Sequence, residues 1–149
     1  MEIKDMIKKP VIVKHDMTLK KVVEIMTEKD VNSVLVVDSD WKLVGSVDIV
    51  TLLNAVVPEY VGNRDMWVAN FTTEELFQEF IEENKKKKVD SFMMDTHKVL
   101  KESSTALKAC ITVTEWRQTR VPVVDEDNKP VWIITRKGVR KYLAKHMGL

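Results

Sequence analysis

The chain reads Val-Leu-Val-Val-Asp-Ser-Asp-Trp-Lys-Leu-Val at residues 34–44 and Val-Pro-Val-Val-Asp-Glu-Asp-Asn-Lys-Pro-Val at residues 121–131. Each stretch is a dense β-branched run, a polar turn and a second apolar run, which predicts a buried β-hairpin. The two stretches lie 87 residues apart, and the same offset relates Lys14 to Lys101, Thr18 to Thr105 and Lys21 to Lys108. A duplication of this length predicts two similar units that pack on each other, with the functional cleft between them.

The sequence around each hairpin predicts the same order of elements: strand, helix, strand, strand, helix. In the first unit we expect a strand at residues 11–13, a helix capped by Thr18, and a final helix that Asp48 caps and that ends before Pro58. The second unit repeats this order with a strand at residues 98–100, a helix from Thr105 whose inner face carries Ala106, Ala109, Cys110 and Val113, and a final helix capped by Thr135. The fold class is therefore expected to be α/β (α+β).

Residues 58–88 separate the two units and predict a helical linker. The spacing of Leu76, Phe77, Phe80 and Ile81 predicts an amphipathic helix over residues 73–83. Thr72 and Glu75 match a capping box, Phe71 and Leu76 match its hydrophobic staple, and residues 85–88 form a solvated lysine run at the helix end. The expected organisation is a first domain at 1–57, the linker at 58–88 and a second domain at 89–149.

Composition limits the classes of protein that the chain can represent. The 149 residues are 44% hydrophobic and carry a net charge of +1, so no global field favours nucleic acid or membrane. The single cysteine, Cys110, excludes an intrachain disulfide and any multi-cysteine metal site. No signal-like or membrane-spanning apolar stretch is present, which predicts a cytoplasmic location.

The repeated apolar-Val-Val-Asp strand, polar hairpin and capped final helix resemble a tandem pair of cystathionine-β-synthase (CBS) domains, often called a Bateman module. The resemblance covers roughly residues 3–56 and 89–146, and residues 18–26 and 120–125 are the most family-like. It implies a pseudo-two-fold pair with two clefts that commonly bind adenosine nucleotides or related adenosyl ligands. It also implies a homodimer.

The family's ligand motif begins with Gly, continues with two apolar residues and Thr or Ser, and ends with Asp three residues later. The hydroxyl meets phosphate at a helix N-terminus, and the carboxylate binds ribose. The first unit has Asp48 in place of the hydroxyl and Thr51 in place of the carboxylate. The second unit keeps Thr135, but it has Trp132 in place of the first Gly and Gly138 in place of the ribose Asp. Ribose recognition is therefore altered in both units.

The resemblance supplies a set of candidate ligand-binding residues. Arg120 stands where the family often places a phosphate-binding arginine, and its alternative role is a surface ion pair. Thr135 can contact phosphate and cap its helix at once, while Trp132 can fill a cleft or offer a stacking face. Asp48 would repel phosphate, so the first cleft suits a cap position or a site for a hydroxylated or cationic ligand. The complete candidate set is Arg120, Thr135, Arg136, Trp132, Ile133, Asp48 and Thr51.

Other polar residues have simpler explanations. The three histidines show no metal-ligand spacing, the hairpin aspartates suit turns, and Cys110 suits a core position. No nucleophile elbow, Walker loop or paired metal motif occurs, so we expect neither a catalytic nor a metal site.

The sequence thus predicts a stand-alone regulatory or sensor module, not an enzyme. It would have no cofactor beyond a regulatory ligand such as AMP, ADP, ATP or S-adenosylmethionine. We expect a homodimer joined by the final helices through Leu52, Leu53 and Val56 and through Val139 and Leu143, together with a protein target still to be identified. One alternative is a dimeric scaffold with degenerate clefts. A disfavoured alternative is a nucleic-acid binder that uses the C-terminal basic helix, with Arg136, Arg140, Lys141 and Lys145.

Overall fold

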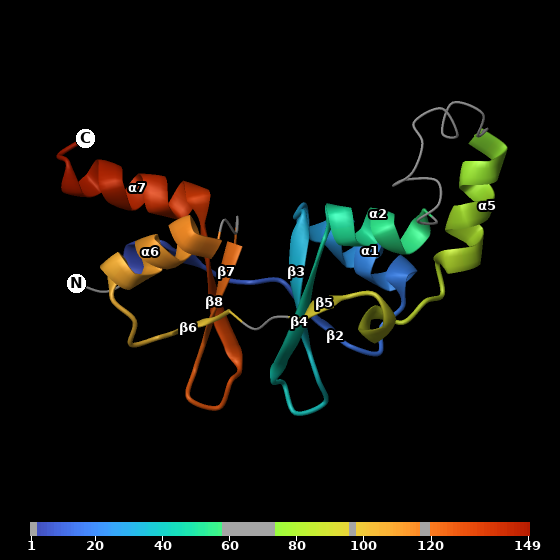
Figure 1. The fold of residues 1–149 in the computed structure, drawn as a ribbon, viewed down its shortest axis with the longest axis horizontal. Coiled ribbons are helices and arrows are strands. Elements are labelled where there is room, and N and C mark those ends of the chain that lie inside the picture. The colour runs from blue at the N-terminus through green and yellow to red at the C-terminus, as the bar shows by residue number, and fades with distance from the viewer. Residues whose placement is uncertain (1–2, 58–73, 96–97, 117–119) are drawn as a thin grey trace. The chain divides into compact units, whose positions relative to one another are not determined.

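The computed structural model describes residues 3–57, 74–95, 98–116 and 120–149 (Figure 1). Two short 3-10 helices, η1 and η2, each precede a two-residue strand, and longer helices alternate with hairpins. In chain order the elements are η1 (Ile3–Asp5), β1 (Ile7–Lys8), β2 (Ile12–Lys14), α1 (Leu19–Lys29), β3 (Ser33–Val37), β4 (Leu43–Asp48), α2 (Ile49–Val56), α5 (Glu74–Asn84), η2 (Val89–Ser91), β5 (Met94–Asp95), β6 (Leu100–Lys101), α6 (Ala106–Trp116), β7 (Arg120–Val124), β8 (Pro130–Thr135) and α7 (Arg136–His146).

The structure confirms the duplication. The bounds of α1, β3 and β4 recur, 87 residues later, as the bounds of α6, β7 and β8. Val36 and Val123, equivalent residues in β3 and β7, are both fully buried. The mixed α/β fold class expected from the repeated pattern is therefore confirmed.

The helix caps and hairpin turns of the first repeat recur at the equivalent positions of the second. Thr18 and Thr105 each accept a hydrogen bond on Oγ1 from the backbone N–H three residues on, at 3.2 and 3.1 Å. In the hairpins, Asp38 Oδ1 accepts from the backbone of Asp40 and Lys42, and Asp125 Oδ1 makes the same two bonds with its own loop. Turn chemistry, not cation binding, thus accounts for these aspartates.

The sheets show a feature that the sequence pattern did not reveal. One sheet has the order β2-β3-β4-β5, and the other has the order β1-β8-β7-β6. The strand β1, at the start of the first repeat, pairs with β8 of the second repeat, and β5, at the start of the second repeat, pairs with β4 of the first. Each repeat therefore gives its leading strand to the other repeat's sheet.

The contacts divide the chain into two units that are not continuous in sequence. Unit 1 contains residues 1–10, 37–44 and 96–149, and unit 2 contains residues 11–36 and 45–95. In unit 1, α6, α7 and η1 cover one hydrophobic cluster. Its buried members are Ile3, Met6, Leu100, Ala106, Ala109, Val121, Val123 and Ile134, with Cys110, Val113, Trp132, Val139 and Tyr142 packed against them. Cys110 and Val113 thus face inward, as expected.

Some of the interface residues predicted from sequence need correction. Leu52 and Val56 of α2 are each only 9% exposed and belong to the core, so of the three α2 residues expected at a dimer interface only Leu53 is accessible. In α7, Val139 packs against the core cluster, whereas Leu143 is 44% exposed.

In unit 2, α5 ends against the C-terminus of α2. The last carbonyls of a helix have no partner within it. Asn84 Nδ2 donates to the Val56 carbonyl at 3.2 Å, and Lys87 Nζ donates to the Ala55 carbonyl at 3.0 Å. Lys85 pairs with Glu82 at 2.6 Å and lowers the pKa of that carboxyl by hydrogen bonding and charge. Lys86, Lys87 and Lys88 are exposed, as expected of a solvated lysine run. The side chain of Lys87 in addition reaches α2, whereas Lys85 pairs with Glu82 one turn earlier in α5.

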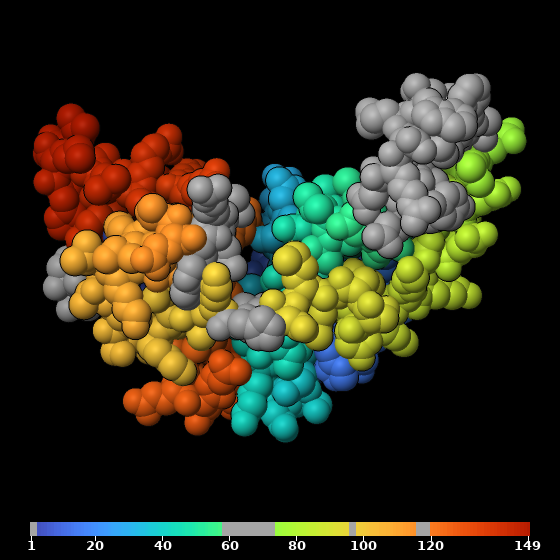
Figure 2. Space-filling view, in the orientation of Figure 1, coloured from blue at the N-terminus to red at the C-terminus, as the bar shows by residue number. Residues whose placement is uncertain are grey.

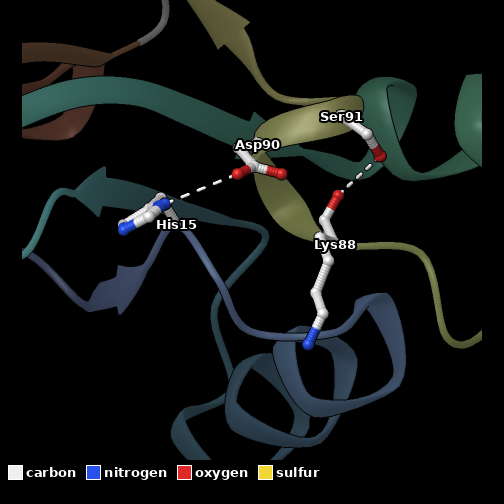
Figure 3. A network of polar contacts seen from close by, with 4 residues as sticks. All are labelled: His15, Lys88, Asp90 and Ser91. Carbon is white, nitrogen blue, oxygen red and sulfur yellow. Dashed lines mark hydrogen bonds and ion pairs between the residues drawn. The ribbon is translucent and has the colours of Figure 1, made fainter.

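The segment after α5 then runs along the start of α1. Leu19 and Lys20 donate their backbone N–H groups to the Lys87 and Lys85 carbonyls, at 2.8 and 2.9 Å. Figure 3 shows the end of this segment. There His15 Nδ1 lies 3.5 Å from Asp90 Oδ2, and Ser91 Oγ donates to the Lys88 carbonyl. The predicted linker helix is confirmed as α5, whereas Phe71 and Thr72 of its predicted staple and capping box lie outside the described residues.

We predict that Met6→Ala destabilises the second repeat's sheet, although Met6 belongs to the first repeat. Met6 is 1% exposed within the unit 1 cluster, and truncating such a side chain costs about 2–5 kcal/mol. Urea denaturation measures the loss, and hydrogen exchange should show reduced protection of the β8 amides. Lys8→Ala, at an exposed position of β1, is the control and should change stability by less than about 0.5 kcal/mol. Equal effects of the two variants would contradict the exchange of strands.

Candidate functional site

The structure brings Arg120 and Thr135 together. Arg120 begins β7 and Thr135 ends β8, and the two are direct partners in the antiparallel register. Cross-strand partners project from the same face of a sheet, so both side chains lie on one face, beside the N-terminus of α7. Arg136, the first residue of that helix, is exposed next to them. Arg120 and Thr135 thus lie beside a helix N-terminus, where an anion would be stabilised, and Arg136 adds a positive charge to the first turn of that helix.

Arg120 directly follows residues 117–119, which lie outside the described part of the chain. None of the ion pairs among the described residues involves it, and the side chain is half-buried. The surface ion pair considered for Arg120 is therefore not seen in this part of the chain.

Thr135 is the N-cap of α7. Its Oγ1 accepts a hydrogen bond from the Gly138 N–H at 3.0 Å, so one lone pair and the hydroxyl proton remain for another partner. Capping and ligand contact are compatible at this residue, as the sequence analysis expected.

The remaining second-repeat candidates separate onto the two faces of the sheet. Ile133 pairs with Pro122 and shares the face of Thr135, but it is only 4% exposed. Trp132 pairs with Val123 on the opposite face and packs against the helix-covered core cluster. The stacking role considered for Trp132 does not fit this placement, because alternation along β8 turns its ring away from Thr135.

Gly138 stands where the family motif has the ribose-binding carboxylate, and the structure gives the reason. A Cβ atom built on Gly138 would lie 2.2 Å from the carbonyl oxygen of Met6. No real side chain tolerates such an approach, so the chain segment before β1 excludes any carboxylate here. The departure from the motif thus coincides with a close backbone contact, and the signal in the sequence is a glycine inside a helix, where glycine is disfavoured.

In the first repeat, the candidates Asp48 and Thr51 bind each other. Asp48 Oδ1 accepts from the Thr51 backbone N–H at 2.8 Å and from Thr51 Oγ1 at 2.9 Å, capping α2. Thr51 is 5% exposed, so its hydroxyl is committed to this bond. This pair of residues therefore caps a helix. The group that it would present to an anion is a carboxylate, which would repel the anion.

A groove that the sequence analysis did not identify opens at the other end of β6 and β7. It has a volume of about 880 Å³ and is lined by the Lys101–Ser103 segment and by Val124–Asp127. Four of its seven lining residues are carboxylates, which disfavours a phosphate, and Asp125 is already engaged in its turn. Among the described residues, no cluster of histidine, cysteine and acidic side chains could hold a metal ion.

Comparison with known proteins identifies the class of protein to which this fold and site belong. The family model described as "CBS domain" matches twice, at residues 2–58 and 89–145, so the chain belongs to the CBS domain family as a tandem pair. Within the part of the chain that the structure describes, helices of a length and hydropathy suited to crossing a membrane are not found.

Particular relatives share this architecture. The chain is 29% identical over 140 residues to the chloroplastic CBS domain-containing protein CBSX1 of Arabidopsis thaliana, covering 86% of this chain and 56% of CBSX1. It is also 29% identical to the uncharacterized protein MJ1426 of Methanocaldococcus jannaschii, covering 91% of this chain and 87% of that protein. The solved structure of CBSX2, also from Arabidopsis thaliana, in complex with AMP aligns with a TM-score of 0.72 at 25% identity and covers 98% of both chains.

We predict that Gly138→Ala destabilises the protein by about 1–3 kcal/mol, since the new methyl group meets the Met6 backbone. The sign of the change in stability tests the close approach, because Gly→Ala at an unobstructed helix position stabilises a protein by roughly 0.5–1 kcal/mol. Thermal denaturation followed by circular dichroism measures the change. Lys137→Ala, at the exposed neighbouring position, serves as the control, and a stabilised Gly138→Ala variant would refute the close approach.

Proposed function

We propose that this protein is a regulatory module that binds an adenosine nucleotide or a related adenosyl ligand through its second repeat. The observation that carries the proposal is the register of β7 and β8, which places Arg120 beside Thr135 at the start of α7. A guanidinium, a hydroxyl and helix N–H groups together suit a phosphate. The resemblance to CBSX2, whose structure contains AMP, points to the same ligand class.

The two repeats are expected to differ in what they bind. Asp48 occupies the position equivalent to Thr135, and a carboxylate close to a phosphate is repelled by roughly a few kcal/mol at intermediate dielectric. In the second repeat, the Met6 backbone leaves no room for a ribose-binding carboxylate at position 138. We therefore propose one site of modest affinity, in which the phosphate provides most of the recognition.

The module would act without catalysing a reaction. Ligand binding shifts the population of conformations only if it favours one of them, and a partner protein would detect that shift. In this proposal the family domains at residues 1–57 and 89–149 flank the helical segment 58–88, and the active form is a homodimer. A cytoplasmic location stays a prediction, since CBSX1 is a chloroplast protein.

Calorimetry with AMP and ATP tests the site. We expect Arg120→Ala to weaken phosphate-dependent binding by about 10- to 100-fold, the value of one charge-assisted hydrogen bond of roughly 1.5–3 kcal/mol. Thr135→Ala should weaken binding less and also lower stability by about 1 kcal/mol through loss of the cap, whereas Thr135→Ser should retain both properties.

Arg140→Ala is the matched control, because it removes an exposed cation from α7 outside the proposed site. If both Arg120→Ala and Thr135→Ala bind as tightly as the wild type, the site lies elsewhere. A wild-type protein that binds neither nucleotide would favour the alternative of a dimeric scaffold.

A further inference from the structure

The sheet of unit 1 carries all its charged side chains on one face. Its strands, β1, β6, β7 and β8, contain no acidic residue. Their charged residues are Lys8 in β1, Lys101 in β6 and Arg120 in β7. Ile7, Leu100 and Val121, which adjoin these three cations in the chain, pack in the helix-covered core cluster. Because neighbouring residues of a strand face opposite ways, all three cations project from the face away from the helices.

Lys8 lies beside the site at Thr135. The strand order β1-β8-β7 places β8 between Lys8 and Arg120. Lys8 pairs with Ile133, and Arg120 pairs with Thr135, which lies two residues further along β8 on the same face. Diagonal neighbours in an antiparallel pair are about 7–8 Å apart, within reach of a long side chain. Lys8 can therefore reach the space above Thr135 from the side opposite Arg120.

The sheet itself supplies no negative charge to Lys8. The side chain is exposed, and none of the ion pairs among the described residues involves it. Between Lys8 and Arg120, the face consists of Ile133 and Pro122, which pair with each other and are both buried. A negatively charged ligand is therefore the group that complements this part of the face.

We propose that Lys8 is a further binding residue of the site at Thr135, and that it makes this site favour ligands with two or three phosphates over a monophosphate. The inference rests on the proposed function. One phosphate is held by Arg120, Thr135 and the N-terminus of α7. The strands β1 and β7 are roughly 10 Å apart, so a longer phosphate chain carries further negative charge across β8 to Lys8.

The exchange of strands gives this residue its place. Lys8 belongs to the first repeat, and it reaches the second repeat's site only because β1 pairs with β8. The ammonium group of a lysine is a compact charge on a flexible stem, which suits contact with a mobile phosphate chain better than fixed bidentate geometry does. The first repeat thus completes the ligand site of the second.

Lys101 offers a matched comparison, since it is the same residue type on the same face. It pairs with Val124, at the opposite end of β7 from Arg120. In Figure 2, α7 (red) and the loop that joins β7 to β8 (dark orange) lie at opposite ends of unit 1. Four residues of a strand span roughly 13 Å, which exceeds the Debye length of about 8 Å at physiological ionic strength. Lys101 also lines the groove that is rich in carboxylates, so its removal should leave nucleotide binding unchanged.

Calorimetry with AMP, ADP and ATP tests the inference on the full chain, at physiological ionic strength and with EDTA present to remove Mg²⁺. We expect the wild type to bind ATP about tenfold more tightly than AMP, the contribution of one charged contact in a partly solvated site. Lys8→Ala should weaken ATP binding by about tenfold and AMP binding by no more than about twofold. Lys8→Arg, which keeps the charge, should retain the preference for ATP, and Lys101→Ala should match the wild type.

The outcomes separate this inference from the proposed function. The inference alone is overturned if the wild type binds AMP and ATP equally, if Lys8→Ala weakens both by the same factor, or if Lys101→Ala has the effect of Lys8→Ala. A wild type that binds no nucleotide overturns the inference and the proposed function together. Circular dichroism establishes that the variants are folded, as expected for substitutions at exposed positions.

Discussion

The close approach between the Met6 carbonyl and Gly138 links the start of the chain to the helix that ends the second repeat. This contact requires that residue 138 have no side chain, and it accompanies the pairing of β1 with β8. A second glycine, Gly45, lies where β5 pairs with β4. A Cβ atom at Gly45 would lie 2.7 Å from the Met94 carbonyl oxygen, so this close approach also requires a residue without a side chain. A glycine in helix α7 thus makes room for the segment that leads into β1, and a glycine in strand β4 makes room for β5. Neither sheet is complete without the segment that begins the opposite repeat, so each repeat contributes a strand to the fold of the other.

The sequence predicted the parts of this fold that rest on local chemistry. Apolar periodicity located α1 and α6, and the dense Val-Val-Asp runs located β3 and β7. The caps at Thr18 and Thr135 followed from side-chain oxygens that can satisfy the first N–H groups of a helix. The strands β1 and β5 could not be predicted, because two residues carry no alternation and their partners lie far away in the chain. Exchange of these strands is a tertiary property that only the structure reveals.

The candidate site shows the same division between local and distant information. The family motif correctly located Thr135 at a helix N-terminus, and only the register of β7 and β8 shows that Arg120 is its direct neighbour. Trp132 looked equally suitable as a ligand contact, but alternation along the strand turns it to the opposite face, where it is partly buried against the core cluster. From the sequence, Gly138 is only a position that lacks the carboxylate of the family motif. In the structure, a Cβ atom at this position would collide with the Met6 backbone. Sequence spacing thus identified the candidates, and the faces of the sheet decided which of them can act together.

Duplication gives two equivalent sets of positions, and the differences between them carry the functional information. At the helix caps, Asp48 and Thr135 perform the same structural task, but only the neutral hydroxyl leaves room for an anion. On the helix surfaces, Ile49 and Leu53 are replaced by Arg136 and Arg140, although an exposed position requires neither residue type for folding. The first repeat thus combines an acidic helix cap with an apolar surface, and the second combines a hydroxyl cap with a basic surface. Neither difference changes the position at which the helix begins, since α2 and α7 start 87 residues apart, so both differences concern what the surfaces of the repeats can contact rather than how the repeats fold.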